Sequence, residues 1–499
     1  MNVLGAGRIE LSHPDKLFID GRWRSTTSGR TLRLINPVSE EQFFVVAEAG
    51  PEDVEAAVAA ARRAFDHGPW PRMSPSERAQ IMRRLAEALE RRAPAVESAW
   101  ICQIGTPLFM ARGSAKGAAR VLNYYADLAD RFPFEDVRPS GGMSSKYAVV
   151  VREPVGVTAT IAPWNGPLGT MITKVAPALA AGCTIVMKPS PESPLEAFLL
   201  CEAAEEAGLP DGVLNLLPAD REVSDMLVRH SGIDKVSFTG STAAGLHIAQ
   251  VCASRMARFT MELGGKSAAI VLEDFSPGEL GPALAPLITV NTGQVCINYS
   301  RVLVPRHRES AYVESLAAAM SATVVGDPFD ETVRMGPLAM ARQYERVTAY
   351  IGKGVAEGAT LAVGGGRPAG LDRGYFIEPT VFANATNDMT IAREEIFGPV
   401  TAVIPYDSEE EAIAIANDTE FGLSGGIFTH DTDRAYAVGR RIRTGTFTQN
   451  GREFDLTNPF GGFKKSGMGR ELGPEGLDPY LEIKTIFLPE LPSSLRQSQ

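Results

Sequence analysis

Residues 155–188 read VGVTATIAPWNGPLGTMITKVAPALAAGCTIVMK and join an apolar, β-rich run to a longer apolar stretch of helical length. This order predicts a strand over residues 155–162, a helix ending at Ala181 and a second strand over residues 183–187. The same alternation continues along the chain, with helices expected over residues 194–207, 220–230 and 241–253 and strands over residues 213–217 and 235–238. Strands that alternate with helices of this length indicate parallel βαβ units and a doubly wound sheet.

The remainder of the chain predicts further structural units. At 499 residues it exceeds what one hydrophobic core usually serves, so more than one domain is expected. A second α/β region is predicted from Leu263 to about Pro459. The β-rich residues 147–151 and 480–488 lie far apart in sequence, and these two segments could pair as a small appendage.

Composition and charge exclude several classes of protein. A net charge of −11 disfavours non-specific nucleic-acid binding, and no apolar stretch is long enough to predict a membrane span. Residues 1–16 lack the pattern of a secretory signal. The five cysteines are widely spaced and form no metal-ligand pattern with the six histidines, so we expect no metal and a reducing, cytoplasmic location.

Two residues carry a complete chemical interpretation. Cys296 ends the turn-forming run Asn-Thr-Gly-Gln-Val-Cys, and Glu262 opens Glu-Leu-Gly-Gly-Lys. A thiol can add to an aldehyde carbonyl, and a carboxylate can activate water against the thioester that follows hydride loss. Each residue alone also has a simpler interpretation, as a buried small hydrophobe and as a surface charge. Spacing does not prove that they meet.

Other candidates follow predicted strands, where a parallel sheet binds ligands. Asn165 could donate to an oxyanion together with the Cys296 backbone N–H, or could cap the next helix. Ser241 could present a hydroxyl to a pyrophosphate, or could serve only as a helix cap. Lys188 could bind a cofactor ribose or be solvated, and Glu395 and Phe397 offer a carboxylate and an aromatic ring.

These motifs together resemble the aldehyde dehydrogenase superfamily. The similarity runs from the Leu-Phe-Ile-Asp-Gly segment at Leu17 to the Pro-Phe-Gly-Gly-Phe-Lys-Lys-Ser-Gly segment at Pro459. Its most specific parts are Met-Glu-Leu-Gly-Gly-Lys at residues 261–266 and Gly-Gln-Val-Cys at residues 293–296. The resemblance implies an α/β fold with a Rossmann-like cofactor domain, an α/β catalytic domain and a small β oligomerisation arm.

The resemblance also implies domain bounds and residue roles. The NAD(P)-binding domain is expected over residues 1–130 and 151–262, the catalytic domain over 263–459, and the arm over 131–150 and 478–499. Cys296 is expected as nucleophile, Glu262 as general base and Asn165 as oxyanion donor. The residues expected to hold the cofactor are Ile161, Trp164, Lys188, Ser190, Gly240, Ser241, Gly245, Leu263, Glu395 and Phe397. A homodimer or homotetramer is expected.

Two departures from the family pattern affect specificity. Many NAD-using members carry a glutamate three residues after the lysine, but here that position is Pro191 and Glu192 follows it. We expect NAD, with NADP possible. The expected substrate tunnel is lined by Gly117, Gly166, Thr173, Val295, Ile297, Phe454 and Phe460. Its small residues and aromatic wall predict a roomy, apolar tunnel for a bulky, neutral aromatic or terpenoid-like aldehyde.

The leading hypothesis is therefore NAD(P)-dependent oxidation of an aldehyde to its acid with water as acyl acceptor. One alternative is acylating oxidation, in which coenzyme A takes the acyl group. Another is a binding or structural protein that keeps the fold without turnover. The presence of Glu262 favours hydrolysis over acylation, and Cys296, Glu262 and Asn165 together favour an enzyme.

Overall fold

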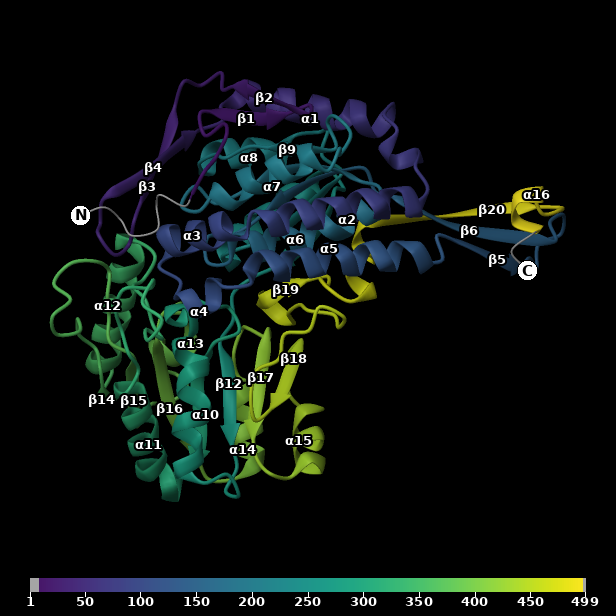
Figure 1. Ribbon diagram of the computed structural model, residues 1–499. Coiled ribbons are helices and arrows are strands. Elements are labelled where there is room, and N and C mark those ends of the chain that lie inside the picture. Colours follow the sequence, from purple (N-terminus) through teal and green to yellow (C-terminus); the bar gives the residue numbers. More distant parts are fainter. Residues whose placement is uncertain (1–8, 497–499) are drawn as a thin grey trace.

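The computed structural model describes residues 9–496, and its first large sheet contains the strand–helix alternation expected from the sequence (Figure 1). The strand order is β19-β11-β10-β7-β8-β9, with β7 to β11 parallel and β19 antiparallel at the edge. The strands are β7 (Val157–Ile161), β8 (Thr184–Lys188), β9 (Leu214–Leu216), β10 (Lys235–Thr239), β11 (Arg258–Glu262) and β19 (Gly467–Met468). This order confirms the predicted doubly wound, Rossmann-like sheet.

Helices cover both faces of this sheet because successive strand residues point to opposite sides. Ile185 of β8 packs into one hydrophobic cluster and Val186 into the other. One cluster draws on α2 (Pro75–Arg91), α3 (Ala93–Ile104), α5 (Ser114–Arg131), α6 (Pro167–Ala181) and α7 (Leu195–Glu206). The other draws on α1 (Pro51–Asp66), α8 (Arg221–Arg229) and α9 (Thr242–Ser254). Both faces are therefore closed to solvent by apolar packing.

The second large sheet has the order β14-β15-β16-β13-β12-β17-β18, parallel except for β14. Its strands are β12 (Ser267–Val271), β13 (Tyr299–Pro305), β14 (Thr360–Val363), β15 (Thr380–Ala383), β16 (Val400–Tyr406), β17 (Ser424–Phe428) and β18 (Thr446–Gln449). Its helices are α10 (Pro277–Thr289), α11 (Glu309–Ser321), α12 (Ala341–Ala356), α13 (Thr390–Arg393), α14 (Glu409–Asn417) and α15 (Thr432–Gly439). The α/β fold class is thus confirmed in both regions.

The two strands expected to pair as an appendage do so. In a three-stranded antiparallel sheet, β6 (Tyr147–Pro154) lies between β5 (Glu135–Pro139) and β20 (Leu481–Leu488). Figure 1 shows this arm extending away from the two large sheets. Strand β6 continues past the predicted arm boundary at residue 150. The assignment of whole domains to residue ranges remains a prediction.

The remaining elements are short. They are β1 (Lys16–Ile19), β2 (Arg22–Ser25), β3 (Thr31–Ile35), β4 (Gln42–Ala47), α4 (Leu108–Ala111) and α16 (Ser493–Arg496). Part of the segment judged for a secretory signal, residues 1–8, lies outside the described residues. From residue 9 to residue 496, no helix has both the length and the apolar character needed to cross a bilayer.

Candidate active site

The carboxyl ends of four parallel strands lie side by side and form what we call the carboxyl edge of the first sheet, as distinct from its outer strands. Ile161 pairs with both Lys188 and Phe238, and Thr239 pairs with Glu262. The turn after β10 reaches across this edge, because the Gly240 N–H donates to the Glu262 carbonyl at 3.0 Å. Glu262 and Lys188 therefore both lie at the carboxyl ends of strands in one sheet.

The nucleophile loop, defined as residues 290–296, has an unusual backbone. Asn291, Thr292 and Gly293 all have positive φ, at 48°, 57° and 68°. Three successive left-handed residues turn the chain sharply after α10. Cys296 follows this turn, is half-buried and lies just before β13 begins. A Cβ at Gly293 would lie 2.2 Å from the Gly398 carbonyl oxygen, so only glycine fits this close approach.

The Glu262 segment packs directly against the nucleophile loop. A Cβ on Gly265 would lie 2.3 Å from the Cys296 carbonyl oxygen, so the two backbones are in contact at that point. The Glu262 side chain is 2% exposed, and its charge acts on the Cys296 thiol. The structure thus brings together the two residues whose proximity the sequence could not prove.

Asn165 joins the same site from the segment before α6. Its Nδ2 donates to the Gln294 carbonyl at 2.8 Å, within the nucleophile loop. Helix α6 is capped at Gly166, so the interpretation of Asn165 as a helix cap is wrong. An amide nitrogen carries two hydrogens, so Asn165 keeps a second donor beyond the one given to Gln294.

Burial, and to a smaller extent nearby negative charge, favours the protonated form of the Cys296 thiol. Burial, with the carboxylates of Glu395 and Glu262 nearby, raises the pKa of the Cys296 thiol to about 12. Burial also raises the pKa of Glu395 to about 7, although its carboxylate accepts from the Gly265 N–H at 2.9 Å. The Cys296 thiol, with a pKa of about 12, is protonated at neutral pH.

Glu262, the predicted general base, lies in a buried environment that favours its protonated form. Burial raises its pKa well above the usual range, the Glu471 carboxylate raises it further, and Lys174 and Arg470 oppose the shift. Among the described residues, neither of its carboxylate oxygens has a hydrogen-bond partner. A carboxylate left unpaired in a buried site is free to take a proton from water.

Sequence reasoning missed the charged pair beside Glu262. Lys174 is fully buried, donates to Thr239 Oγ1 at 2.6 Å and pairs with the carboxylate of Glu471. The detectable signal was Lys174 itself, the one basic residue within the apolar helix α6. Arg452 was missed as well; it donates to the Leu287 carbonyl at 2.9 Å and interacts electrostatically with Cys296.

Several of the predicted cofactor residues lie at or near the carboxyl ends of the strands of the first sheet. Ser241 caps α9, accepting from the Ala244 N–H at 3.3 Å, as one of its two interpretations required. A Cβ on Gly245 would lie 2.4 Å from the Leu263 side chain, so glycine allows α9 to pack against Leu263.

The predicted cofactor residues also include aromatic and charged side chains. Trp164 and Phe397 form an edge-to-face pair with ring centroids 5.3 Å apart. Burial lowers the pKa of Lys188 to about 8. Glu192 accepts from the Ser190 hydroxyl and pairs with Arg342 at 2.5 Å. Glu192 stands one position after the place where the family carries its glutamate. Its charge nevertheless acts on Lys188 at the end of β8.

The predicted tunnel residues fall into two groups. A Cβ on Gly117 would meet nothing within 4 Å, and one on Gly166 would meet only Thr170 Oγ1 at 3.4 Å, so both positions border open space. Phe454 and Phe460 have ring centroids 5.7 Å apart, and Val295 and Ile297 flank Cys296 in sequence. Thr173 differs, because its hydroxyl bonds to the buried Glu471 carboxylate at 3.0 Å.

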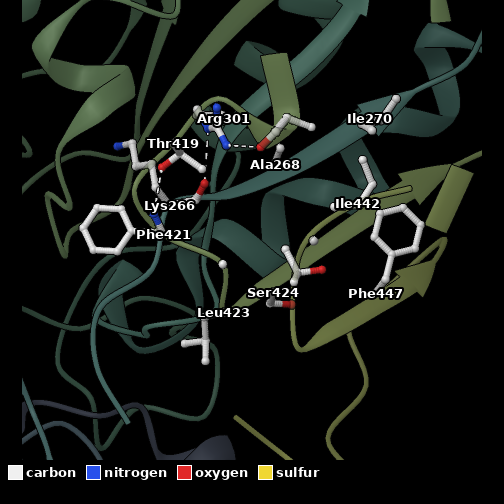
Figure 2. A pocket seen from close by; sticks show the side chains of 14 residues that line it. Lys266, Ala268, Ile270, Arg301, Thr419, Phe421, Leu423, Ser424, Ile442 and Phe447 are labelled. Atoms are coloured by element: carbon white, nitrogen blue, oxygen red, sulfur yellow. Dashed lines mark hydrogen bonds between the residues drawn. The ribbon is translucent and has the colours of Figure 1, made fainter. Parts of the chain in front are cut away.

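The far side of the Glu262 segment is anchored to the second sheet. The buried guanidinium of Arg301 on β13 donates to the carbonyls of Lys266, Ile415 and Ala416. Figure 2 shows Arg301 and Lys266 at one end of a small cavity that has Ile442 and Phe447 at its other end. Arg301 therefore ties the strand that follows Glu262 to the strand that follows Cys296.

Comparison with known proteins agrees with this geometry. Residues 23–486 match the model of the aldehyde dehydrogenase family. The chain is 45% identical over 473 residues to a geranial dehydrogenase from Castellaniella defragrans, covering 95% of this chain and 98% of that protein. It is 42% identical over 475 residues to a 3-succinoylsemialdehyde-pyridine dehydrogenase from a Pseudomonas species, covering 95% and 98%.

Solved structures give the same result. A Mycobacterium tuberculosis aldehyde dehydrogenase complexed with NAD+ superposes with a TM-score of 0.93 at 43% identity, covering 96% of this chain and 99% of that one. A cysteine-to-alanine mutant of aldehyde dehydrogenase C from Pseudomonas syringae, complexed with NAD+ and octanal, superposes with a TM-score of 0.92 at 39% identity, covering 97% and 99%. The chain belongs to the aldehyde dehydrogenase family and is an oxidoreductase of aldehydes.

The raised thiol pKa predicts slow alkylation of Cys296 in the cofactor-free protein. With iodoacetamide, the rate should rise with pH and reach no plateau below about pH 10, because the thiolate fraction grows until the pKa near 12. Glu395→Gln removes a negative charge and should lower this pKa, so alkylation at pH 8 becomes about tenfold faster for each unit of decrease. Cys296→Ala reports the background from the four buried cysteines. A plateau below pH 9 in the unmodified protein contradicts the electrostatic account.

Proposed function

We propose that this protein oxidises an aldehyde to its carboxylic acid through a thioester on Cys296, which water hydrolyses with Glu262 as base. The observation that carries the proposal is the contact between Gly265 and the Cys296 carbonyl, which holds base and nucleophile on adjacent segments. Of all the described pairs of groups, these two supply the chemistry that both halves of the reaction need.

The side chains have separate tasks in this scheme. The Cys296 thiol releases its proton to solvent, and its sulfur bonds to the carbonyl carbon of the aldehyde while one electron pair of the C=O bond moves onto the oxygen. The second N–H of the Asn165 amide and the Cys296 backbone N–H stabilise the oxyanion. Loss of hydride leaves the thioester. Glu262 then removes a proton from water, the resulting hydroxide attacks the thioester carbon, and the acid leaves while the sulfur regains its electron pair.

NAD is the proposed hydride acceptor, and the edge of the first sheet fits it. The α9 N-terminus with Gly240 and Ser241 suits a pyrophosphate, and the buried Lys188 suits a ribose. Ile161, Trp164, Leu263 and Phe397 supply an apolar wall for the nicotinamide end. A nicotinamide cofactor held by these residues would supply the hydride acceptor that the oxidation needs. The Gly265 N–H donates to Oε1 of Glu395, so Oε2 remains to accept from a ribose hydroxyl.

The buried, unpaired Glu262 supports hydrolysis over transfer to coenzyme A. A carboxyl group buried without a hydrogen-bond partner among the described residues costs free energy even when it is protonated, and an acylating enzyme would not need it. The same cost in free energy argues against a binding protein without catalytic activity, which would have no use for a buried carboxyl group.

We propose a bulky, neutral aldehyde as substrate, as the sequence predicted. Gly117 and Gly166 border open space and the Phe454–Phe460 pair offers an aromatic wall, which together favour an apolar body. The similarity to a geranial dehydrogenase supports the same choice. Arg452 argues for a different class, because a guanidinium without a described carboxylate partner near Cys296 suits an aldehyde that carries an acid group.

The arm is proposed to mediate assembly into a homodimer or homotetramer. Strand β20 lies at the edge of its sheet and exposes Ile483 and Phe487, at 69% and 61%. An exposed edge strand with apolar side chains favours pairing with a second copy of the chain. The five free cysteines support a reducing, cytoplasmic location.

A panel of aldehydes tests the proposed substrate class. With NAD, kcat/KM should be at least about tenfold higher for geranial- or benzaldehyde-type substrates than for succinate semialdehyde, because extra buried methylenes each contribute roughly 0.8 kcal/mol. Acid production should not require coenzyme A, and Cys296→Ala should abolish NADH formation. A preference for succinate semialdehyde would favour the Arg452 interpretation, and a requirement for coenzyme A would contradict the hydrolytic scheme.

The position of Glu192 predicts a preference for NAD over NADP. Burial tends to raise its pKa, but the Ser190 hydroxyl and Arg342 outweigh burial and lower it, so Glu192 is ionised at neutral pH and repels a 2′-phosphate. Glu192→Gln should narrow the ratio of kcat/KM for NAD over NADP by about tenfold, or 1.4 kcal/mol. Glu87→Gln, on an exposed face of α2, is the matched control. An unchanged ratio in Glu192→Gln would show that discrimination resides elsewhere.

A further inference from the structure

Asn291 and Thr292 adopt a backbone conformation that non-glycine residues rarely keep. Both have positive φ, and both are buried, at 3% and 1% exposed. Such a conformation persists only where surrounding contacts hold it, and it is least favourable for a β-branched residue such as Thr292. The Thr292 hydroxyl donates to the Gly336 carbonyl at 3.0 Å, which anchors one side of the turn.

The Asn291 side chain anchors the other side of the turn through hydrogen bonds of its amide oxygen and its amide nitrogen. Its Oδ1 accepts from the hydroxyl of Thr106 at 2.8 Å, and its Nδ2 donates to the backbone carbonyl of Asn165 at 3.0 Å. The carbonyl of Asn165 can only accept, so the nitrogen of the Asn291 amide must face it and the oxygen must face Thr106. Thr106 is itself fully buried just after α3, which leaves its hydroxyl oriented toward Asn291.

Asn165 and the nucleophile loop are therefore bonded to each other in both directions. The loop donates from the Asn291 side chain to the Asn165 backbone, and Asn165 donates from its side chain to the Gln294 backbone. Trp100 Nε1 gives the Asn165 carbonyl a second donor at 3.2 Å. These bonds set the position of the Asn165 amide relative to Cys296, the two groups that the proposed mechanism uses on one carbonyl.

We propose that Asn291, oriented by Thr106, is a positioning residue that sets the distance between the Asn165 amide and Cys296. This inference rests on the proposed function, because the distance matters for adding the thiol to a carbonyl whose oxygen Asn165 stabilises. Neither Asn291 nor Thr106 touches the reacting atoms. Both act by fixing the two segments that do.

Four variants isolate this role, and Asn291→Ala, alone and combined with Thr106→Val, tests whether the two residues act as one unit. Asn291→Asp keeps the shape and the Thr106 contact but turns a carboxylate oxygen toward the Asn165 carbonyl, where two acceptors repel. Thr106→Val removes the hydroxyl at nearly constant volume, and Thr106→Ser restores it. Thr289→Val is the matched control, because the buried Thr289 hydroxyl bonds only within its own helix, to the Ala285 carbonyl at 2.9 Å.

The rate of NADH formation in the first turnover is the main measurement, with NAD affinity and thermal stability measured in parallel. We expect that rate to fall about 100-fold in Asn291→Asp and about tenfold in Thr106→Val, because misplaced reacting groups react more slowly. NAD affinity should stay within about twofold. Thr106→Ser should recover most of the rate, and the losses of Thr106→Val and Asn291→Ala should not multiply in the double variant.

A structural role alone predicts a different pattern. If Thr106→Val and Thr289→Val lose similar stability and both keep the first-turnover rate within twofold, the proposal is wrong. Alkylation of Cys296 by iodoacetamide gives a readout that needs no aldehyde, and Thr106→Val should change its rate whereas Thr289→Val should not. An unmodified protein inactive on every aldehyde would contradict the proposed function, while the alkylation comparison would still decide whether Thr106 positions the loop.

Discussion

The close approach of two backbones at Gly265 and Cys296 is the constraint on which the site depends. A side chain on Gly265 would overlap the Cys296 carbonyl, and one on Gly293 would overlap Gly398. The Glu262 segment, the nucleophile loop and the Glu395 segment can therefore converge only through glycines. Arg301 holds the Glu262 segment against the second sheet by donating a hydrogen bond to the Lys266 carbonyl. Sterics, rather than any single strong bond, bring base and nucleophile together.

That convergence has an electrostatic consequence. It buries Glu262, Glu395 and the Cys296 thiol, and burial is the main reason why the pKa values of all three groups rise. The carboxylates of Glu395 and Glu262 raise the pKa of the Cys296 thiol further. A raised carboxyl pKa means that base activity grows as pH rises through it, and a raised thiol pKa keeps the resting nucleophile protonated.

The sequence predicted the parallel sheets and the arm pairing because strand and helix periodicities are local and strong, as in residues 155–188. It identified Cys296 and Glu262 by chemistry, but their contact depends on a backbone approach that no local pattern encodes. It misassigned Asn165 as a possible helix cap because Asn favours that position, whereas a long-range bond to Gln294 decides its orientation. The Lys174–Glu471 and Thr106–Asn291 contacts join residues at least 185 positions apart and could not be inferred from spacing.

The central claim is that an acyl group on Cys296 is released to water by Glu262. The direct measurement is intact-protein mass spectrometry of Glu262→Gln, quenched after mixing with an oxidisable aldehyde and NAD. The account predicts one equivalent of NADH, an acyl mass added to the peptide that carries Cys296, and slow release of acid. Multiple turnovers at the unmodified rate, with no acyl adduct on Cys296, would contradict it.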